Sequence, residues 1–292
     1  MSTWKVSKVT DMDGMFYSAI AFSGDISSWD TSQVTSMSLM FAAASKFRGD
    51  LSAWDVSKVT NMRSMFQIAK VFNSYLTAWS VSKVTDMAKM FEDASAFSSD
   101  LSAWDVSSVT ETWNMFKGAK VFNSDISAWK VSKVTNMAVM FAEALAFRSN
   151  VSAWDVSGVK SMEAMFRGAK AFDSDVSSWN VSSVTNMAYM FKGAREFSSD
   201  LSAWNIARVT DMKQTFYYAR SFNQDLCAWA DKLKYLDAKR DIFTGTSCKF
   251  PADPESNKRG PFCASTCQTA SVVWSTVSYW CRINILCDAQ LC

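Results

Sequence analysis

The sequence predicts an α/β fold: a solenoid of nine 25-residue coils, each with a short parallel strand and a short helix, plus a small Cys-containing C-terminal cap. Two observations predict it. Tryptophan recurs every 25 residues from Trp4 to Trp229, without insertion or deletion. Within each repeat, a stretch of alternating apolar residues precedes a stretch with helical spacing. A fixed period of this length means that each repeat buries its apolar side only by stacking on its neighbours.

The repeat reads W-D-V-S-x-V-T-x-M-x-x-M-F-x-x-A-x-x-F-x-x-D-L-S-A, and nine full copies run from Trp4 to Ala228. We therefore expect a repeat domain at residues 1–228, followed by a cap and a Cys-rich tail at residues 229–292.

The first part of each repeat predicts a strand. In "LSAWDVSKVTNMRSMF" (residues 51–66), Leu51, Trp54 and Val56 match the L-x-x-L-x-L template of leucine-rich repeats. Trp54 and Val56 are two residues apart, so they share one face of a strand. The tryptophans are therefore expected to form a buried column rather than an exposed carbohydrate-stacking face. This core column is Trp29, Trp54, Trp79, Trp104, Trp129, Trp154, Trp179 and Trp204.

The second part of each repeat predicts a helix. Met62, Met65, Phe66 and Ala69 follow the spacing i, i+3, i+4, i+7, which places them on one helix face. Asn61 precedes them as a suitable N-cap, and its neighbour Thr60 is the alternative cap. The helix is expected to end near residue 70, because a 25-residue coil leaves room for only two or three turns.

The polar side of the predicted strand is the expected recognition surface, because it varies while the frame around it stays constant. Its central column changes charge from coil to coil, and a serine column follows two residues later. Such variation fits partner recognition, and it fits neutral drift on a solvated face equally well. The residues expected to contact a protein or glycan ligand are Asp30, Asp55, Ser57, Ser80, Asp105, Ser107, Lys130, Asp155, Asn180 and Asn205.

Two other polar columns allow competing interpretations. Aspartates at Asp25, Asp50 and equivalent positions would repel one another when stacked. They could accept backbone N–H bonds in turns, or bind Ca²⁺ between coils. Threonines at Thr10, Thr35 and equivalent positions could cap helices, or bind ice as a flat hydroxyl array. We favour the turn and cap roles, because each coil offers only one such residue of each kind.

The composition argues against an enzyme. The chain has 292 residues and a net charge of +2, and it contains no histidine. Without histidine the commonest general base and metal ligand are missing, so no Ser-His-Asp triad can form. The nearly neutral charge argues against a nucleic-acid partner. We expect a non-enzymatic protein without a cofactor.

The repeat also resembles a known family. "FNSDISAWKVSKVTNMAVMFAEALAF" (residues 122–147) is similar to the repeat of BspA-like leucine-rich-repeat surface proteins, which occur among bacterial lipoproteins and algal proteins and have no known biochemical function. The resemblance covers residues 1 to about 228. It implies an extracellular or cell-surface location and a role in adhesion or recognition, and it brings no catalytic residue. The sequence shows no signal peptide at its start.

All seven cysteines follow residue 226, which indicates an oxidising compartment. A disulfide between Cys248 and Cys263 is expected, because it would close the polar loop between them. Algal members of the resembling family look similar here, with "TSC" and "GPFC" ending the array. Free thiols and a metal site are the alternatives, although "CASTC" lacks the spacing of a zinc knuckle. An odd count leaves at least one thiol unpaired or joined to another chain.

The tail "ASVVWSTVSYWCRINILC" is apolar and aromatic. It is too short and too rich in Ser and Thr before Arg282 to predict a membrane-spanning helix, so it is expected to be a cap strand or a weak anchor.

Two functions are compatible with these features. The first is a cell-surface or secreted recognition protein that binds protein or glycan through the polar strand face. The second is a structural array that associates end to end, since a terminal coil without a cap offers an open edge.

Overall fold

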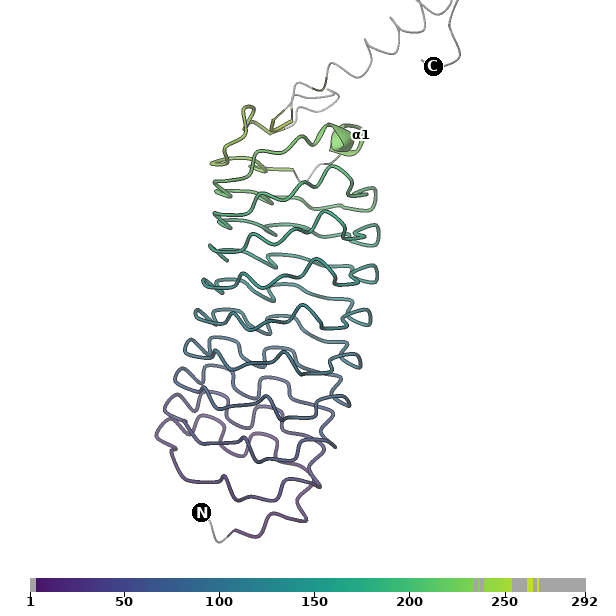
Figure 1. The fold of residues 1–292 in the computed structure, drawn as a ribbon. Helices are drawn as coiled ribbons and strands as arrows, with labels where there is room; N and C mark the ends of the chain where they lie inside the picture. Colours follow the sequence, from purple (N-terminus) through teal and green to yellow (C-terminus); the bar gives the residue numbers. More distant parts are fainter. Residues whose placement is uncertain (1–3, 234–235, 237–238, 254–261, 265–266, 268–292) are drawn as a thin grey trace, which may run out of the picture.

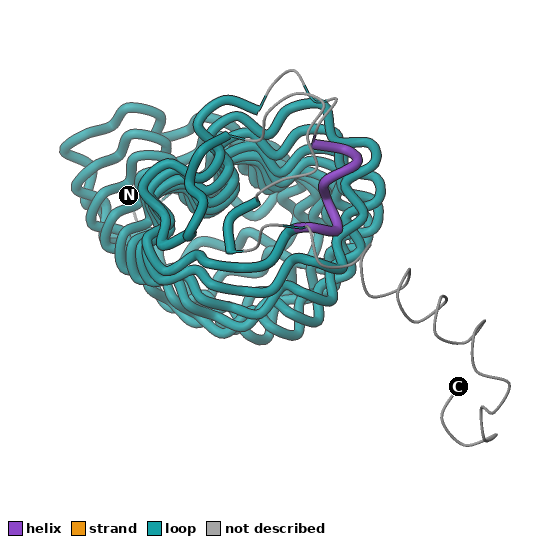
Figure 2. Tube along the Cα trace, turned by 90° about the horizontal axis from the view of Figure 1, so that it is seen from above, coloured by secondary structure: helices purple, strands orange, loops and turns teal. Residues whose placement is uncertain are grey.

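The protein winds into a stack of coils, one for each 25-residue repeat (Figure 1). The computed structural model describes residues 4–233, 236, 239–253, 262–264 and 267. Successive coils lie directly above one another from the N-terminal end of the stack to α1, and seen from above they enclose a common interior (Figure 2). A ladder of isolated parallel bridges joins equivalent residues of adjacent coils, from Asp11↔Ser36 through to Asn186↔Asp211.

The predicted α/β architecture is wrong. In the described residues the repeats contain neither a regular strand nor a helix, only these single bridges and a succession of turns. The short element η1 (Cys227–Trp229) begins at the last two residues of the final repeat, and α1 (Ala230–Leu233) follows it. Nearly the whole described chain is accordingly drawn as loop in Figure 2.

Hydrogen bonds along one side of the coils, which we call the wall, explain why no helix forms there. The N–H groups of Met62, Ser64, Phe66 and Ile68 donate to carbonyl groups of the next coil, at N···O distances of 2.7–2.9 Å. A helix would use these donors within itself and leave none to join the coils. The N–H groups of Met65, Gln67 and Ala69 instead close turns within the coil, each to the carbonyl three residues earlier.

The backbone dihedral angles also exclude a helix in this part of the coil. Two residues per coil have positive φ, for example Ser64 at 54° and Ile68 at 60°. These residues are four apart, so this side of the coil consists of two consecutive turns. The two turns place Met62, Met65, Phe66 and Ala69 in the interior, at the same sequence spacing as residues on one face of a helix. The apolar spacing thus predicts the inward-facing residues correctly and the helix wrongly.

The predicted caps have other roles. Asn61 Oδ1 accepts the N–H of Arg63 at 3.0 Å and so closes a turn rather than starting a helix. The N–H and the hydroxyl of Thr60 both donate to the carbonyl of Thr35 in the preceding coil, at 2.9 and 3.2 Å. The threonine column therefore joins coils.

Aromatic columns fill the interior. Phe66 and Phe72 of one coil stack at a centroid distance of 3.9 Å, and Phe66 stacks on Phe91 of the next coil at 5.6 Å. The eight tryptophans expected in the core are buried, with exposed fractions of 2–4%. From Trp54 to Trp229, each indole N–H donates to a carbonyl 28 residues earlier, as in Trp54 Nε1 to the Ile26 carbonyl at 3.1 Å. The tryptophan column thus combines packing with hydrogen bonds between coils.

Trp29, at the start of the second repeat, lacks this bond. Trp29 Nε1 is buried and has no hydrogen-bond partner among the described residues. The equivalent acceptor, 28 residues earlier, would belong to residue 1, which lies outside the described residues.

The cap continues the stack. The N–H groups of Phe216 and Tyr218 donate to the carbonyls of Ile242 and Thr244 at 3.0 and 2.8 Å, as they would to a further coil. Ile242 and Phe243 are fully buried, and Phe243 stacks on Phe216 at 5.8 Å.

Two disulfides lie in the cap region. One joins Cys248 and Cys263, the pair expected from the sequence. The other joins Cys227 and Cys267, across 40 residues, and was not expected. The tail from residue 268 onward, including the stretch considered as an anchor, lies outside the described residues.

The positive φ of Gly193 predicts that replacing this glycine lowers the stability of the protein. Gly193 has φ +72°, whereas the φ of Gly158 is not positive; a Cβ at either position would meet neighbouring atoms only at ordinary distances of 3.5 Å or more. We expect Gly193→Ala to lower the free energy of unfolding by about 1 kcal/mol because of backbone strain. The control Gly158→Ala should be neutral or slightly stabilising. Urea denaturation measures both, and equal effects would contradict the assigned conformation of Gly193.

Candidate functional site

The residues expected to contact a partner lie at the surface, once per coil. Most side chains are exposed, and Ser57 and Ser107 are half-buried. The exposed members are Asp30, Asp55, Ser80, Asp105, Lys130, Asp155, Asn180 and Asn205.

Most carboxylates and amides of this column also close turns. Asp55 Oδ1 accepts the N–H of Ser57 at 2.9 Å, and Asp105 Oδ1 accepts that of Ser107 at 3.0 Å. The same bond, at 3.0–3.2 Å, is made by Asp30, Asp155, Asn180 and Asn205. This turn bond uses an acceptor two residues before the donor, which both Asp and Asn provide and Lys130 does not. Variation between Asp and Asn in this column changes charge and preserves the turn.

These bonds keep the carboxylates ionised. The hydroxyl and the backbone N–H of the serine two residues later lower the pKa of Asp55, Asp105 and Asp155 below the ordinary aspartate value. Because the pKa is lowered in the folded chain, this stabilisation is present above pH 4 or so and is lost as the pH falls through the folded-state pKa.

The aspartate column considered for Ca²⁺ has the same turn role. Asp50 Oδ1 accepts the N–H of Ser52 at 2.9 Å, and Asp100 Oδ1 accepts that of Ser102 at 2.9 Å. Ser124 then bridges two coils: its hydroxyl donates to Asp100 at 3.2 Å and accepts the N–H of Leu101 at 2.8 Å. Hydrogen bonds thus moderate the repulsion between stacked carboxylates.

Two shallow depressions lie side by side on the expected recognition surface. One, of about 220 Å³, is lined by Asp105, Lys130 and the nearly buried Trp104. The other, of about 350 Å³, is lined by Lys130, Asp155 and the nearly buried Trp129. The structure therefore brings three of the expected residues together, with one cation between two carboxylates. We call this group, Asp105, Lys130 and Asp155, the Lys130 surface.

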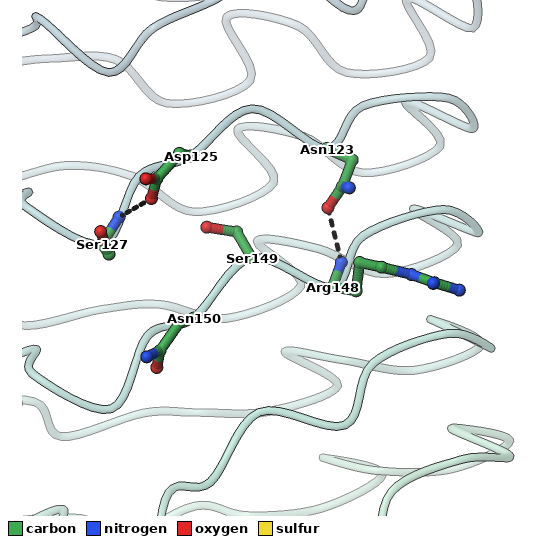
Figure 3. A pocket seen from close by; sticks show the side chains of 6 residues that line it. All are labelled: Asn123, Asp125, Ser127, Arg148, Ser149 and Asn150. Carbon is green, nitrogen blue, oxygen red and sulfur yellow. Dashed lines mark hydrogen bonds between the residues drawn. The ribbon is translucent and has the colours of Figure 1, made fainter.

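A third depression, of about 400 Å³, lies elsewhere, between two coils (Figure 3). Backbone N–H groups occupy the side-chain oxygens of Asn123, Asp125, Ser149 and Asn150. Asn123 Oδ1 accepts the N–H of Arg148 at 2.8 Å, and Asp125 Oδ1 accepts that of Ser127 at 3.0 Å. Asn150 Oδ1 accepts the N–H of Ser152 at 2.9 Å, and the Arg148 side chain points away from the depression (Figure 3). This group holds the coils together and offers little to a ligand.

A polar cluster around Glu92 was not predicted from the sequence. This side chain is buried and accepts hydrogen bonds from Lys117 at 2.8 Å, Gln67 at 2.7 Å and Asn114 at 3.1 Å. Burial raises the pKa of Glu92, but the hydrogen bonds, chiefly from Lys117, outweigh it and leave the pKa below the ordinary value. The signal was present in the sequence, because Glu92 stands where Ala42 and Ala142 stand in other repeats.

A neighbouring aromatic residue also departs from the repeat. Two cations, Arg63 and Lys89, lie over the ring of Trp113 at 4.8 and 4.9 Å from its centroid. Trp113 is one of the tryptophans outside the 25-residue column. Glu92 and Trp113, which both depart from the repeat, therefore mark the two charged clusters.

The family comparison is consistent with the repeats. Four overlapping segments, at residues 1–99, 50–152, 72–173 and 143–251, match the family described as Mycoplasma protein of unknown function, DUF285. The chain belongs to the DUF285 family. No curated protein matches the chain. Membership of DUF285 supports the repeat architecture and leaves the resemblance to BspA-like proteins a prediction.

Among the residues that the structure describes, no helix has the length and apolar character needed to cross a bilayer.

Proposed function

We propose that this chain is a non-enzymatic recognition protein, secreted or at the cell surface, that binds a protein or glycan ligand through the Lys130 surface. The adjoining depressions around Lys130 carry the proposal, because they place a cation between two carboxylates within one exposed area. Charges of both signs in one area suit specific polar recognition better than bulk electrostatic attraction.

The disulfides support the location. Cys227–Cys267 ties the cap to the end of the repeats, and Cys248–Cys263 closes a loop within the cap. Disulfides persist in oxidising compartments and are rare in the cytosol of most cells. An extracellular site of action is therefore part of the proposal.

Replacing carboxylate by amide tests the surface without disturbing its turns. In Asp105→Asn/Asp155→Asn the Oδ1 acceptors remain, as they do naturally at Asn180. We expect this variant to bind at least about tenfold more weakly to ligands found on an array of glycans and extracellular proteins, because hydrogen bonds to charged groups are lost.

Asp25→Asn is the matched control, since Asp25 makes the same turn bond, to Ser27, in another column. It should bind like the original chain. Equal affinity of the double variant and this control would remove the Lys130 surface from consideration, and an array without any bound ligand would contradict the recognition role.

End-to-end association is the second candidate. The first described coil exposes Trp4, Tyr17 and Ile20, each by half or more. The other end of the repeats is covered by the cap, which favours pairing of two first coils over an open array. Sedimentation equilibrium distinguishes a monomer from such a pair.

A further inference from the structure

A groove on the wall of the stack has the features of a separate ligand site. It has a volume of about 430 Å³ and is lined by Glu143, Arg167, Gly168, Lys192, Gly193, Tyr217 and Tyr218. Gly168 and Gly193 occupy equivalent positions in adjacent coils, where Ile68, Asp93 and Glu143 carry side chains. Because neither glycine has a side chain, the surface is recessed over these two coils, between Glu143 and Tyr218. We call this recessed backbone the floor of the groove. Three coil spacings give a length of about 14 Å, that of a short oligosaccharide.

One end of the groove is a fixed aromatic wall. A Cβ at Gly245 would lie 2.9–3.2 Å from three ring atoms of Tyr218, so the ring packs flat on this glycine. Tyr217 meets Tyr218 edge to face at a centroid distance of 4.6 Å. Tyr218 is nonetheless 45% exposed. One face of Tyr218 thus packs against the protein, and the exposed part of the ring can stack on the C–H face of a sugar ring.

Two cations are held along the groove. Lys192 lies 4.9 Å from the ring centroid of Tyr217 and donates to Gln214 Oε1 at 2.7 Å. Arg167 pairs with Glu143 at 3.3 Å while 41% of its side chain stays exposed. Each cation has further N–H donors than these contacts use. Exposed Lys170, Arg195 and Arg220 follow the groove residues by two positions in three successive coils.

The floor disfavours a peptide strand. The N–H of Gly168 donates to the carbonyl of Lys192 at 2.7 Å, and that of Gly193 to Tyr217 at 2.7 Å. These donors are engaged between coils, so a peptide cannot add to the wall through them. A sugar chain needs only a flat floor, an aromatic platform and side-chain donors.

We propose that this groove binds an acidic oligosaccharide, with one ring on Tyr218 and carboxylates at Arg167 and Lys192. The site is independent of the Lys130 surface. It requires no reaction and no metal.

Calorimetric titration with an oligogalacturonate hexamer tests the groove, with maltohexaose and polyglutamate as comparison ligands. We expect binding of the oligogalacturonate, and weaker or no binding of the other two. Tyr218→Ala should weaken binding about tenfold through loss of the stacked ring. Gly193→Ile should abolish it by filling the floor, and it is expected to fold because Ile68 has the same positive φ in its own coil.

Two controls make the result decisive. Tyr75→Ala removes an 80% exposed tyrosine in another coil column, and Asp105→Asn/Asp155→Asn alters the Lys130 surface; both should bind oligogalacturonate normally. Equal binding of polyglutamate would show attraction by charge alone and overturn the proposal. No binding, or an unchanged affinity in Tyr218→Ala, would overturn it too. A changed affinity in the Lys130-surface variant alone, in either direction, would place the ligand there instead.

Discussion

Trp129→Ala is expected to lower the free energy of unfolding by about 3 to 5 kcal/mol, which is the usual cost of truncating a large buried aromatic side chain. Trp129 is 4% exposed, stacks on Trp154 at 6.4 Å and lies 6.2 Å from Phe116. Its indole N–H also donates to the Leu101 carbonyl at 3.2 Å. The effect should extend to both neighbouring coils, because they share these contacts.

Guanidinium denaturation followed by circular dichroism measures this cost. Trp4→Ala provides the matched control, since Trp4 is 50% exposed, and its cost should be well below half as large. Trp129→Phe should fall between them, because it keeps an aromatic ring and loses the N–H bond. Equal costs for Trp129→Ala and Trp4→Ala would show that the column does not form the core.

Removing the Cys248–Cys263 disulfide is expected to destabilise the cap and to leave the middle of the stack intact. Its 15-residue loop corresponds to about 3 kcal/mol of loop-closure entropy. In Cys248→Ser/Cys263→Ser the cap should open more often, so the amides that donate to it should exchange faster. These are Phe216, bonded to Ile242, and Tyr218, bonded to Thr244.

Hydrogen exchange with mass spectrometry resolves the two regions. The Phe116 amide is an internal control, because it donates to Met140 within the stack. Its exchange should not change. Equal acceleration at Phe116 and Phe216 would mean that the cap and the stack open as one unit, and no change at Phe216 would mean that the disulfide contributes nothing to the cap.

The sequence was sufficient to predict which residues point inward. Trp54, Met62, Met65 and Phe66 are all buried, and a 25-residue period requires stacking to bury them. It did not predict the backbone correctly, because two consecutive turns and a short helix place apolar residues at the same spacing. One signal could have separated them. Glycine recurs at Gly118, Gly168 and Gly193, where φ is positive, and a helix interior would disfavour it.

The candidate surface was predictable only in part. Exposure of Asp105 and Asp155 follows from alternation with buried Trp104 and Trp154. Their turn bonds were not anticipated, because the expected strand would have left those side chains unoccupied. The Cys227–Cys267 pairing was also beyond the sequence, since spacing alone does not decide which of seven cysteines meet.

The hydrogen bonds between coils also determine how the molecule would respond to pulling. The N–H groups of wall residues such as Phe66 and Phe91 donate only to the next coil, so tension along the stack would act on the bonded interfaces in series and break them one at a time. Releasing one coil would free 25 residues, which lengthens the molecule by about 80 Å when fully extended. A chain fixed at its ends would therefore yield in steps, and each released coil could rewind on the coils that remain.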